Sequence, residues 1–280
     1  MNFIVLMACH NRKPLTVRAI ERAQDAADFA GIQISFTVFD DGSTDGTGAA
    51  LEAMPQSIQI LRGDGSAFWA KSMAVAEEVT LRSPETSTDS FLLWLNDDVE
   101  LDLGAFLALA DAITRNPGAV IVGAMRDPLS GDVTYSGLKK SGRHPLKFSV
   151  ITPQDACRPA DTFNGNLVAV PHETARLIGG IDGGFSHAFA DIDYGLRSAR
   201  LNIPIVLAPG TYGACARNAI PSRGTVRDDW AAFRGPKGGG NYPSLRRILG
   251  KSHKRSWRLV VAATYILWWA RRMQVIGSLR

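Results

Sequence analysis

The chain has 280 residues, 45% of them hydrophobic and 21% charged, so it can bury a full core and is too apolar for wholesale disorder. Its three cysteines lie far apart and form no CxxC pair, which argues against a zinc site or a disulfide framework and indicates a reducing compartment. The net charge of +4 at pH 7 is modest but unevenly distributed along the chain.

The first part of the chain alternates short apolar runs with helical patterns. The run at 3–8 follows no basic segment and is shorter than a signal peptide requires, so we expect it to be a strand. Further strands are predicted at 34–40, 57–63 and 91–96, and helices at 16–30, 48–54, 70–82 and 103–115. This alternation of continuous apolar strands with helices predicts an α/β fold with a mostly parallel central sheet and helices on both faces.

From residue 116 the pattern is less regular. Residues 127–159 are rich in Gly, Pro, Ser and Lys and should form loops or short hairpins. The other elements are predicted as strands at 119–125, 162–171 and 203–209 and helices at 172–180 and 191–202. We expect a catalytic domain at 1–218 with halves at 1–115 and 116–218, a linker at 219–244 around PKGGGN, and a helical tail at 245–280.

The tail carries basic residues and no acidic one. Its apolar core, residues 259–270, is about 12 residues long, shorter than the roughly 20 needed to span a bilayer. Tryptophans, a tyrosine and flanking arginines make it typical of an amphipathic helix lying on an anionic membrane surface. Packing on the catalytic core or on a second subunit is the alternative, and a nucleic-acid partner is not expected.

Acidic and amide residues gather where predicted strands end, and ligands of open parallel sheets bind outside these carboxyl ends. Such oxygens can hold nucleoside hydroxyls, or a hard divalent cation against phosphates. No GxxxxGK[ST] or GxGxxG motif is present, so a P-loop or dinucleotide-binding site is poorly supported. The same acids could instead serve as helix caps or surface ion pairs. The residues concerned are Asp40, Asp41, Asn96, Asp97, Asp98, Asp191 and Asp193.

Three ordered segments resemble one enzyme family. FTVFDDGSTDGT is similar to the nucleotide-binding stretch of inverting family-two glycosyltransferases with the GT-A fold, and LWLNDDVEL resembles their DXD metal segment. FNGNLVAVPHE followed by GGIDGGFSHAFADIDYGLR resembles their acceptor-side block. The resemblance covers residues 3–218 and is nearest to bacterial polysaccharide enzymes, including rhamnosyltransferase-like members.

The resemblance implies a donor site for a nucleotide-diphospho-sugar. Asp98 would coordinate Mg²⁺ or Mn²⁺, which acts as a Lewis acid on the departing nucleoside diphosphate. The other donor contacts would come from His10, Asn11, Arg12, Asp40, Asp41, Lys71 and Asp97.

The resemblance also implies an acceptor side. Asp191 would be the general base that deprotonates the acceptor hydroxyl, with its pKa raised by partial burial beside Asp193. The acceptor would be a glycan or lipid-linked saccharide of bacterial surface polysaccharide synthesis, met on the cytoplasmic face of the membrane by a peripheral enzyme. Weaker acceptor-side contacts are expected from Trp69, Phe163, Asn164, Gly165, His187 and Asp193.

The sequence departs from the family pattern at three points. Ala190 precedes the base where a Glu is usual, Asn96 opens the DXD segment, and no late His follows, although Cys215 or Asn218 lies nearby. A degenerate protein that binds a nucleotide sugar without turnover is therefore one alternative. A nucleotidyltransferase is another, but it would ordinarily carry a Gly-rich basic loop after the first strand, and MACHNRKPLT has no glycine.

Overall fold

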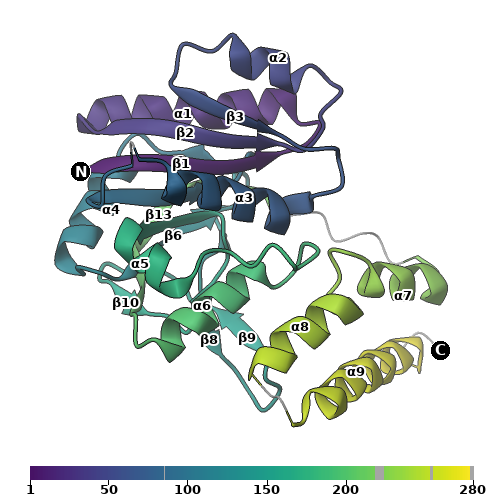
Figure 1. Ribbon diagram of the computed structural model, residues 1–280. Coiled ribbons are helices and arrows are strands. Elements are labelled where there is room, and N and C mark those ends of the chain that lie inside the picture. The colour runs from purple at the N-terminus through teal and green to yellow at the C-terminus, as the bar shows by residue number, and fades with distance from the viewer. Residues whose placement is uncertain (85, 218–223, 253–254, 278–280) are drawn as a thin grey trace.

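The structure, a computed structural model, describes residues 1–84, 86–217, 224–252 and 255–277 (Figure 1). Its first part contains the alternating strands and helices that the sequence predicts. In chain order these are β1 (Asn2–Cys9), α1 (Lys13–Ala30), β2 (Gln33–Asp40), α2 (Thr47–Glu52), β3 (Ile58–Arg62), α3 (Phe68–Arg82), β4 (Ser90–Leu95), β5 (Glu100–Leu101) and α4 (Ala105–Arg115).

The second part contains more short strands than the sequence indicates. The predicted strand at 162–171 is split in two by a turn at 164–166, and the segment 127–159 forms short strands. The elements are β6 (Val120–Arg126), β7 (Val133–Tyr135), β8 (Gly137–Lys140), β9 (Phe148–Val150), β10 (Arg158–Pro159), β11 (Thr162–Phe163), β12 (Leu167–Pro171), α5 (His172–Ile178), α6 (Ala190–Arg200) and β13 (Ile205–Ala214). The tail follows with α7 (Val226–Arg234), α8 (Tyr242–Ser252) and α9 (Trp257–Gly277).

The central sheet has the strand order β10-β13-β6-β12-β4-β1-β2-β3, with β5 paired to β13 and β7 to β6. Strands β1 to β4 are parallel neighbours, and β13 is parallel to β6. A second sheet has the order β11-β8-β9 and is antiparallel. The predicted α/β fold with a mostly parallel sheet is confirmed, with antiparallel strands in its second half.

Strand register brings several chain segments to one edge of the sheet. β1 pairs with β2 up to Cys9 and Asp40 and with β4 up to Leu6 and Trp94, so the carboxyl ends of the three strands lie together. β12 runs antiparallel to β4, with Leu167 opposite Leu95. The turn before β12 therefore reaches the same edge as the end of β4.

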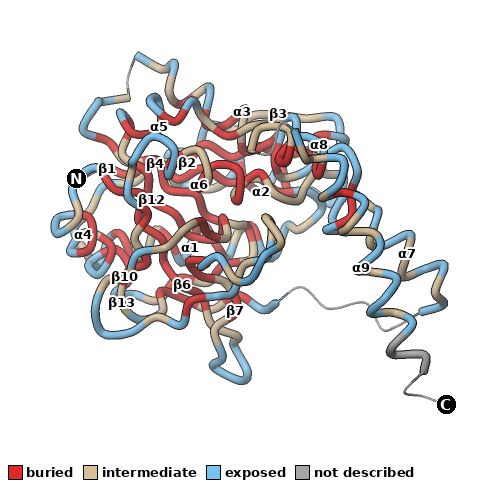
Figure 2. Tube along the Cα trace, turned by 90° about the horizontal axis from the view of Figure 1, so that it is seen from below, coloured by how far each residue is buried: buried red, intermediate tan, exposed pale blue. Residues whose placement is uncertain are grey.

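Helices cover both faces of the sheet, as predicted. Alternate residues of β1 belong to separate apolar clusters because successive side chains of a strand point to opposite faces. Helices α1 and α4 pack in the cluster that contains Val5, and α3, α5, α6 and α8 in the cluster that contains Leu6. Figure 2 shows the buried residues concentrated along the strands between these layers.

The described part of the expected linker at 219–244 contains helix α7, whose first turn is closed by a capping box between Thr225 and Asp228. Helices α7 and α9 project from the body of the molecule (Figure 2). They contact each other through rings: the centroid of Trp230 lies 4.9 Å from that of Trp268 and 5.6 Å from that of Tyr265. Among the described residues, no helix has both the length and the apolarity needed to cross a membrane.

Candidate active site

The loop before α3 is held by the carboxylate of Asp41. Backbone N–H groups of Gly65, Ala67 and Phe68 donate to it at 3.0, 3.2 and 2.9 Å. The backbone carbonyl of Asp41 lies 2.6 Å from Nδ1 of His10, which follows β1. Hydrogen bonds to Asp41 thus hold together the loops that follow β1, β2 and β3, and these loops form one wall of the site. A carboxylate that accepts several backbone N–H groups fixes the position of each of them.

A cavity of about 610 Å³ opens beside this wall at the carboxyl edge of the sheet. It is lined from both halves of the chain, since the loops after β1, β2 and β4 meet the turn before β12 and the start of α6. The predicted site residues that line it are His10, Arg12, Asp41, Trp69, Asp97, Asp98, Asn164, Gly165, His187 and Asp191.

Two acids after β4 share one cation. Nη1 of Arg12 lies 3.0 Å from Oδ1 of Asp97 and 3.0 Å from Oδ2 of Asp98. Burial raises the pKa of Asp97 to about 6, an effect that Arg12 opposes and Asp98 adds to. The guanidinium therefore occupies the position between the two carboxylates where positive charge is needed.

Asp191 lies at the start of α6 and has no ion pair among the described residues. Its carboxylate accepts the N–H of Gly165 at 3.2 Å and that of Ile192 at 2.8 Å. Burial raises its pKa to about 6, against the lowering effect of these bonds. A carboxylate held in position with such a pKa suits a general base near neutral pH.

Asp193 lies on a different side of α6 from the cavity. Its Oδ2 atom is 2.9 Å from Nε of Arg197 and 2.8 Å from Nζ of Lys251, which belongs to α8. The side chain is buried and anchors the tail to α6. The expected pair of neighbouring carboxylates is not formed, and burial rather than Asp193 raises the pKa of Asp191.

Comparison with known proteins places this chain. The model of glycosyl transferase family 2 matches residues 4–167, which is more than half of the sequence. The chain belongs to glycosyl transferase family 2. A comparison with curated protein sequences finds no match.

Solved structures share the fold of this family 2 chain at low sequence identity. S. aureus TarS 1-349 has a TM-score of 0.55 and 14% identity, over 77% of this chain and 60% of that one. GalNAc-T7 with UDP, GalNAc and Mn²⁺ has a TM-score of 0.62 and 11% identity, over 89% and 47%. TarS 1-349 in complex with UDP-GlcNAc gives 0.55 and 14%, over 84% and 65%. The chain thus spans about half to two thirds of these proteins, and the likeness establishes the GT-A fold.

Few side chains in the cavity could coordinate a divalent cation. Among the described residues, no three His, Cys, Asp or Glu side chains are grouped as a metal site. Where a late His is usual in the family, Sγ of Cys215 lies 3.5 Å from Oδ1 of Asp98, and Asn218 lies outside the described residues. Burial raises the pKa of this thiol, so it stays protonated and is a poor ligand. The carboxylates suit a cation that takes its remaining ligands from a diphosphate.

Three predicted donor residues, Asp40, Asn11 and Lys71, do not line the cavity. Asp40 is buried, accepts the N–H of Ser43 at 3.0 Å and lies 3.9 Å from Arg62. Asn11 accepts the N–H of Thr44 at 2.8 Å, which ties the loop after β1 to the loop after β2. Lys71 is exposed on α3 and is not part of the cavity lining.

The predicted acceptor-side aromatics differ in position. Phe163 is fully buried, with its ring centroid 5.8 Å from that of Trp94, so it cannot stack on a sugar as expected. Trp69 lines the cavity, and its indole N–H donates to Oδ1 of Asn96 at 2.9 Å. Burial lowers the pKa of His187 to about 4, so its ring is neutral at physiological pH. Its Nδ1 atom is buried without a partner among the described residues.

The cavity lining includes residues that sequence reasoning missed. Lys237 and Gly239 belong to the segment interpreted as a linker, yet they reach the cavity from the far end of the chain. The usable signal was a lysine set among consecutive glycines, since chain without side chains can approach a ligand closely. Phe68 and Asn166 also line the cavity, and each is adjacent to a predicted site residue or motif.

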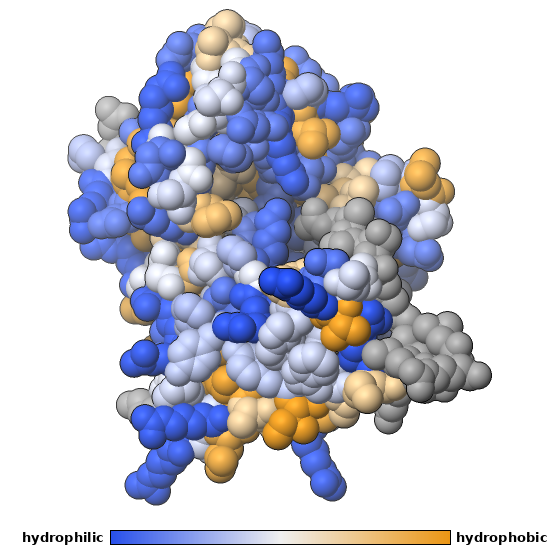
Figure 3. Space-filling model, turned by 90° about the vertical axis from the view of Figure 1, so that its right-hand side faces the viewer, coloured by the Kyte–Doolittle hydropathy of each residue, from blue (hydrophilic) through white to orange (hydrophobic). Residues whose placement is uncertain are grey.

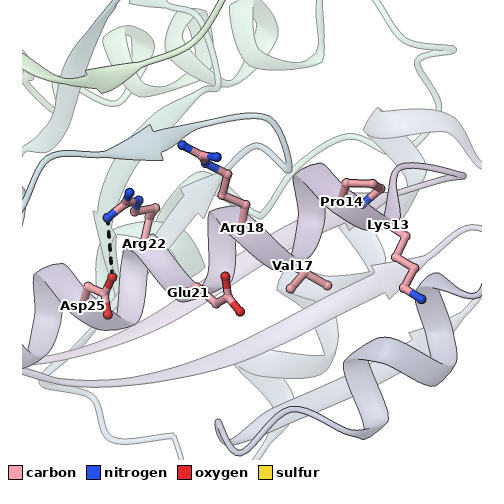
Figure 4. Close-up of a pocket in the computed structure, with 7 residues that line it drawn as sticks. All are labelled: Lys13, Pro14, Val17, Arg18, Glu21, Arg22 and Asp25. Carbon is pink, nitrogen blue, oxygen red and sulfur yellow. Dashed lines mark ion pairs between the residues drawn. The ribbon is translucent and has the colours of Figure 1, made fainter.

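A second hollow, of about 470 Å³, runs along the exposed side of α1 (Figure 4). Its lining comes from this one helix, with side chains of both signs spread along it. Arg22 pairs with Asp25 at 3.7 Å, and Arg18 pairs with Glu100 of β5 at 2.8 Å. This surface gathers no set of catalytic groups, so the chemistry is assigned to the cavity at the sheet edge.

Proposed function

We propose that this protein is an inverting glycosyltransferase that moves a sugar from a nucleotide-diphosphate donor to an acceptor hydroxyl. The observation that carries the proposal is a single cavity that joins a cation-paired acid cluster, Asp97 and Asp98 with Arg12, to the isolated carboxylate of Asp191. The first arrangement suits a charged leaving group and the second suits proton removal.

On the donor side, Asp98 with Asp97 would hold Mg²⁺ or Mn²⁺ together with the diphosphate. The cation, when bound, supplies Lewis-acid stabilisation of the leaving diphosphate. Arg12 is placed to give a further positive charge to the same phosphates, because it already bridges both acids. His10 and Asp41 form the adjacent wall and would face the nucleoside.

On the acceptor side, the carboxylate of Asp191 would take the proton of the attacking hydroxyl. The hydroxyl oxygen forms a bond to the anomeric carbon while the bond from that carbon to the diphosphate oxygen breaks. The electron pair leaves with the nucleoside diphosphate, and attack opposite the departing group inverts the configuration. The N–H of Gly165 orients the base, and Trp69, which lies beside Gly165 and lines the cavity, would contact the sugar.

We further propose that the acceptor is a glycan or lipid-linked saccharide of bacterial surface polysaccharide synthesis. The supporting feature is the tail, whose basic and aromatic residues suit a place at the inner face of the cytoplasmic membrane. A hexosyl or rhamnosyl donor is the expected class.

The test of the proposal is release of nucleoside diphosphate on mixing enzyme, Mn²⁺, acceptor and UDP-, GDP- or dTDP-sugars. Asp191→Asn should lower kcat about 10²- to 10⁴-fold, the range typical of a general base, while donor binding measured by thermal shift is kept. Asp132→Asn, an exposed acid outside the cavity, should behave as wild type.

Other outcomes would point elsewhere. Full turnover by Asp191→Asn would remove the base assignment. Donor binding without any release, in the wild-type protein and with every acceptor tried, would indicate a nucleotide-sugar-binding protein. Release of pyrophosphate from a nucleoside triphosphate would indicate a nucleotidyltransferase.

A further inference from the structure

Helix α9 has an inner face that packs on the rest of the protein. Val261 is buried, and the hydroxyl of Tyr265 donates to the carbonyl of Gly240 at 3.0 Å. The ring centroid of Trp268 lies 5.4 Å from that of Phe233 in α7. Arg272 also faces inward, because it pairs with Asp229 of α7 at 2.8 Å. This face therefore packs against α7, α8 and the loop between them.

The opposite face of α9 is apolar and mostly exposed. At the edge of this face, the ring centroid of Trp269 lies 5.3 Å from that of Trp230 in α7. Leu259, Ile266, Trp269 and Met273 are 75%, 67%, 41% and 61% exposed. Their spacing of seven, three and four residues places them on one side of the helix, and the exposed residues Ala262 and Ala270 fall on the same side. A continuous apolar stripe on the outside of a folded protein marks a site of contact with another protein or with a membrane.

Basic side chains flank this stripe. Arg255 and Arg258 are exposed at the start of α9, and Arg271 is exposed near its end. None of the three forms an ion pair within the described chain, and no acidic residue occurs from residue 245 to the end of the sequence. In Figure 3, hydrophobic side chains gather at the lower edge, where α8 and α9 lie, and long hydrophilic side chains project beside them.

We propose that the outward face of α9, formed by Leu259, Ala262, Ile266, Trp269, Ala270 and Met273, docks in the interface of an anionic phospholipid bilayer. An apolar stripe with an arginine rim matches acyl chains below negative headgroups. A second copy of the chain fits less well. A twofold contact would bring the same unpaired arginines together without any counter-charge from the tail.

Docking through α9 would also set the position of the cavity. Tyr265 holds Gly240, and the adjoining residues Gly239 and Lys237 line the cavity. Helix α8, which packs with α9, contacts Asp193 of the base-bearing helix α6 through Lys251. The docking surface, part of the cavity lining and helix α6 therefore belong to one packed unit. Membrane docking does not depend on the proposed function. Delivery of a lipid-linked acceptor to the cavity by the membrane does depend on it.

The experiment is flotation of the full chain with vesicles of phosphatidylcholine alone and of phosphatidylcholine mixed with phosphatidylglycerol. Wild type should float with the mixed vesicles and lose binding as salt rises, because the arginine contribution is screened. The double variant Leu259→Glu, Ile266→Glu should partition at least about tenfold less, since two charges replace apolar contacts with the acyl region. Leu129→Glu, at a 96% exposed position on another surface, should bind as wild type.

Each alternative result decides against the proposal. Failure of wild type to float with either vesicle would overturn it, as would equal flotation of the double variant. Equal binding to both vesicle compositions would show that binding does not require anionic headgroups, which contradicts the proposal. A concentration-dependent dimer that the double variant loses, without vesicle binding, would identify the face as a self-interface. No sugar donor is present in this assay, so its result is independent of whether nucleoside diphosphate is released in the transfer assay.

Discussion

The two sides of the cavity, which we propose to be the donor side and the acceptor side, hold their carboxylates through different contacts. Burial raises the pKa of Asp97 and of Asp191 alike, to about 6. On the donor side, Arg12 lies 3.0 Å from Asp97 and from Asp98, so positive charge is already present. On the acceptor side, Asp191 contacts only backbone N–H groups among the described residues.

The difference is one of partners rather than of burial. A carboxylate beside an arginine has its ionised form stabilised by the opposite charge, which suits a site that holds a cation and a diphosphate. A carboxylate without a cation can take a proton and release it again at little electrostatic cost. The two sides of one cavity can thus perform different tasks with the same residue type. Two substitutions and a change of pH should affect the two tasks to different extents.

Of these three, the largest effect is expected at Gly165, on the proposed acceptor side. A Cβ atom there would lie 2.9 Å from two ring carbons of Trp69 and 3.5 Å from Cβ of Asp191. Gly165→Ala should therefore clash with the ring of Trp69, whereas 3.5 Å to Asp191 is an ordinary van der Waals contact. Because the N–H of Gly165 bonds the carboxylate of Asp191, movement of this turn to relieve the clash would shift the base, and a misplacement on the order of 1 Å can lower kcat about 100-fold. Donor affinity, measured by calorimetry, should change much less than kcat, because the atoms nearest to the added Cβ do not belong to the acids after β4. A small change is expected, since Trp69 is linked to the segment of these acids through its bond to Asn96.

Gly104→Ala is the matched control, since no atom lies within 4 Å of the Cβ that it would add. It should leave both kcat and donor affinity as in wild type. If Gly165→Ala weakens donor binding as much as it lowers kcat, the two sides of the cavity do not act independently, which contradicts the assignment of different tasks to them.

Much of this arrangement could be predicted from local sequence. The apolar runs identified the strands, and parallel strands place their carboxyl ends together, so the acids after β2 and β4 had to lie near one edge. The resemblance of the segment around Asp191 to the acceptor-side block then predicted the third group. What local pattern does not contain is the orientation of each side chain within an acidic pair.

Local contacts set part of that orientation in both pairs, and in the second pair a tertiary contact with Lys251 adds to them. Asp41 lines the cavity while Asp40 accepts the N–H of Ser43, and Asp191 lines it while Asp193 pairs with Arg197 and Lys251. Lys251 comes from the tail, for which sequence reasoning left open a membrane-facing helix or packing on the catalytic core or a second subunit. A contact between residues 58 positions apart has no signature in either segment alone.

The next effect in size is the pH dependence of transfer, which separates Asp191 from Asp97. Protonation removes the base, so kcat/KM should be level above about pH 6 and fall about tenfold per pH unit below it. The acid limb should persist in Asp97→Asn, whose remaining activity still depends on Asp191. Because the folded state raises the pKa of Asp191, ionisation at higher pH costs stability, and Asp191→Asn should unfold at a higher temperature than wild type at pH 8.

If the fall in kcat/KM below about pH 6 disappears in Asp97→Asn, the group whose protonation lowers activity lies on the donor side. A lower unfolding temperature for Asp191→Asn at pH 8 would mean that the ionised carboxylate has a cationic partner. Either result would contradict the distinction between a paired and an isolated carboxylate.

The smallest effect is expected for Arg12→Ala, and its size should depend on the divalent cation. The guanidinium both contributes charge for the diphosphate and occupies the space between Asp97 and Asp98. Its removal loses a charge-assisted contact, which should raise the donor KM about tenfold at limiting Mn²⁺. It also leaves two adjacent carboxylates unpaired, so calorimetry should show tighter Mn²⁺ binding without nucleotide, and saturating Mn²⁺ should restore most of the donor KM. Unchanged Mn²⁺ affinity in Arg12→Ala would mean that the arginine and the cation do not compete for the same two acids, and the donor side would then need another cation site.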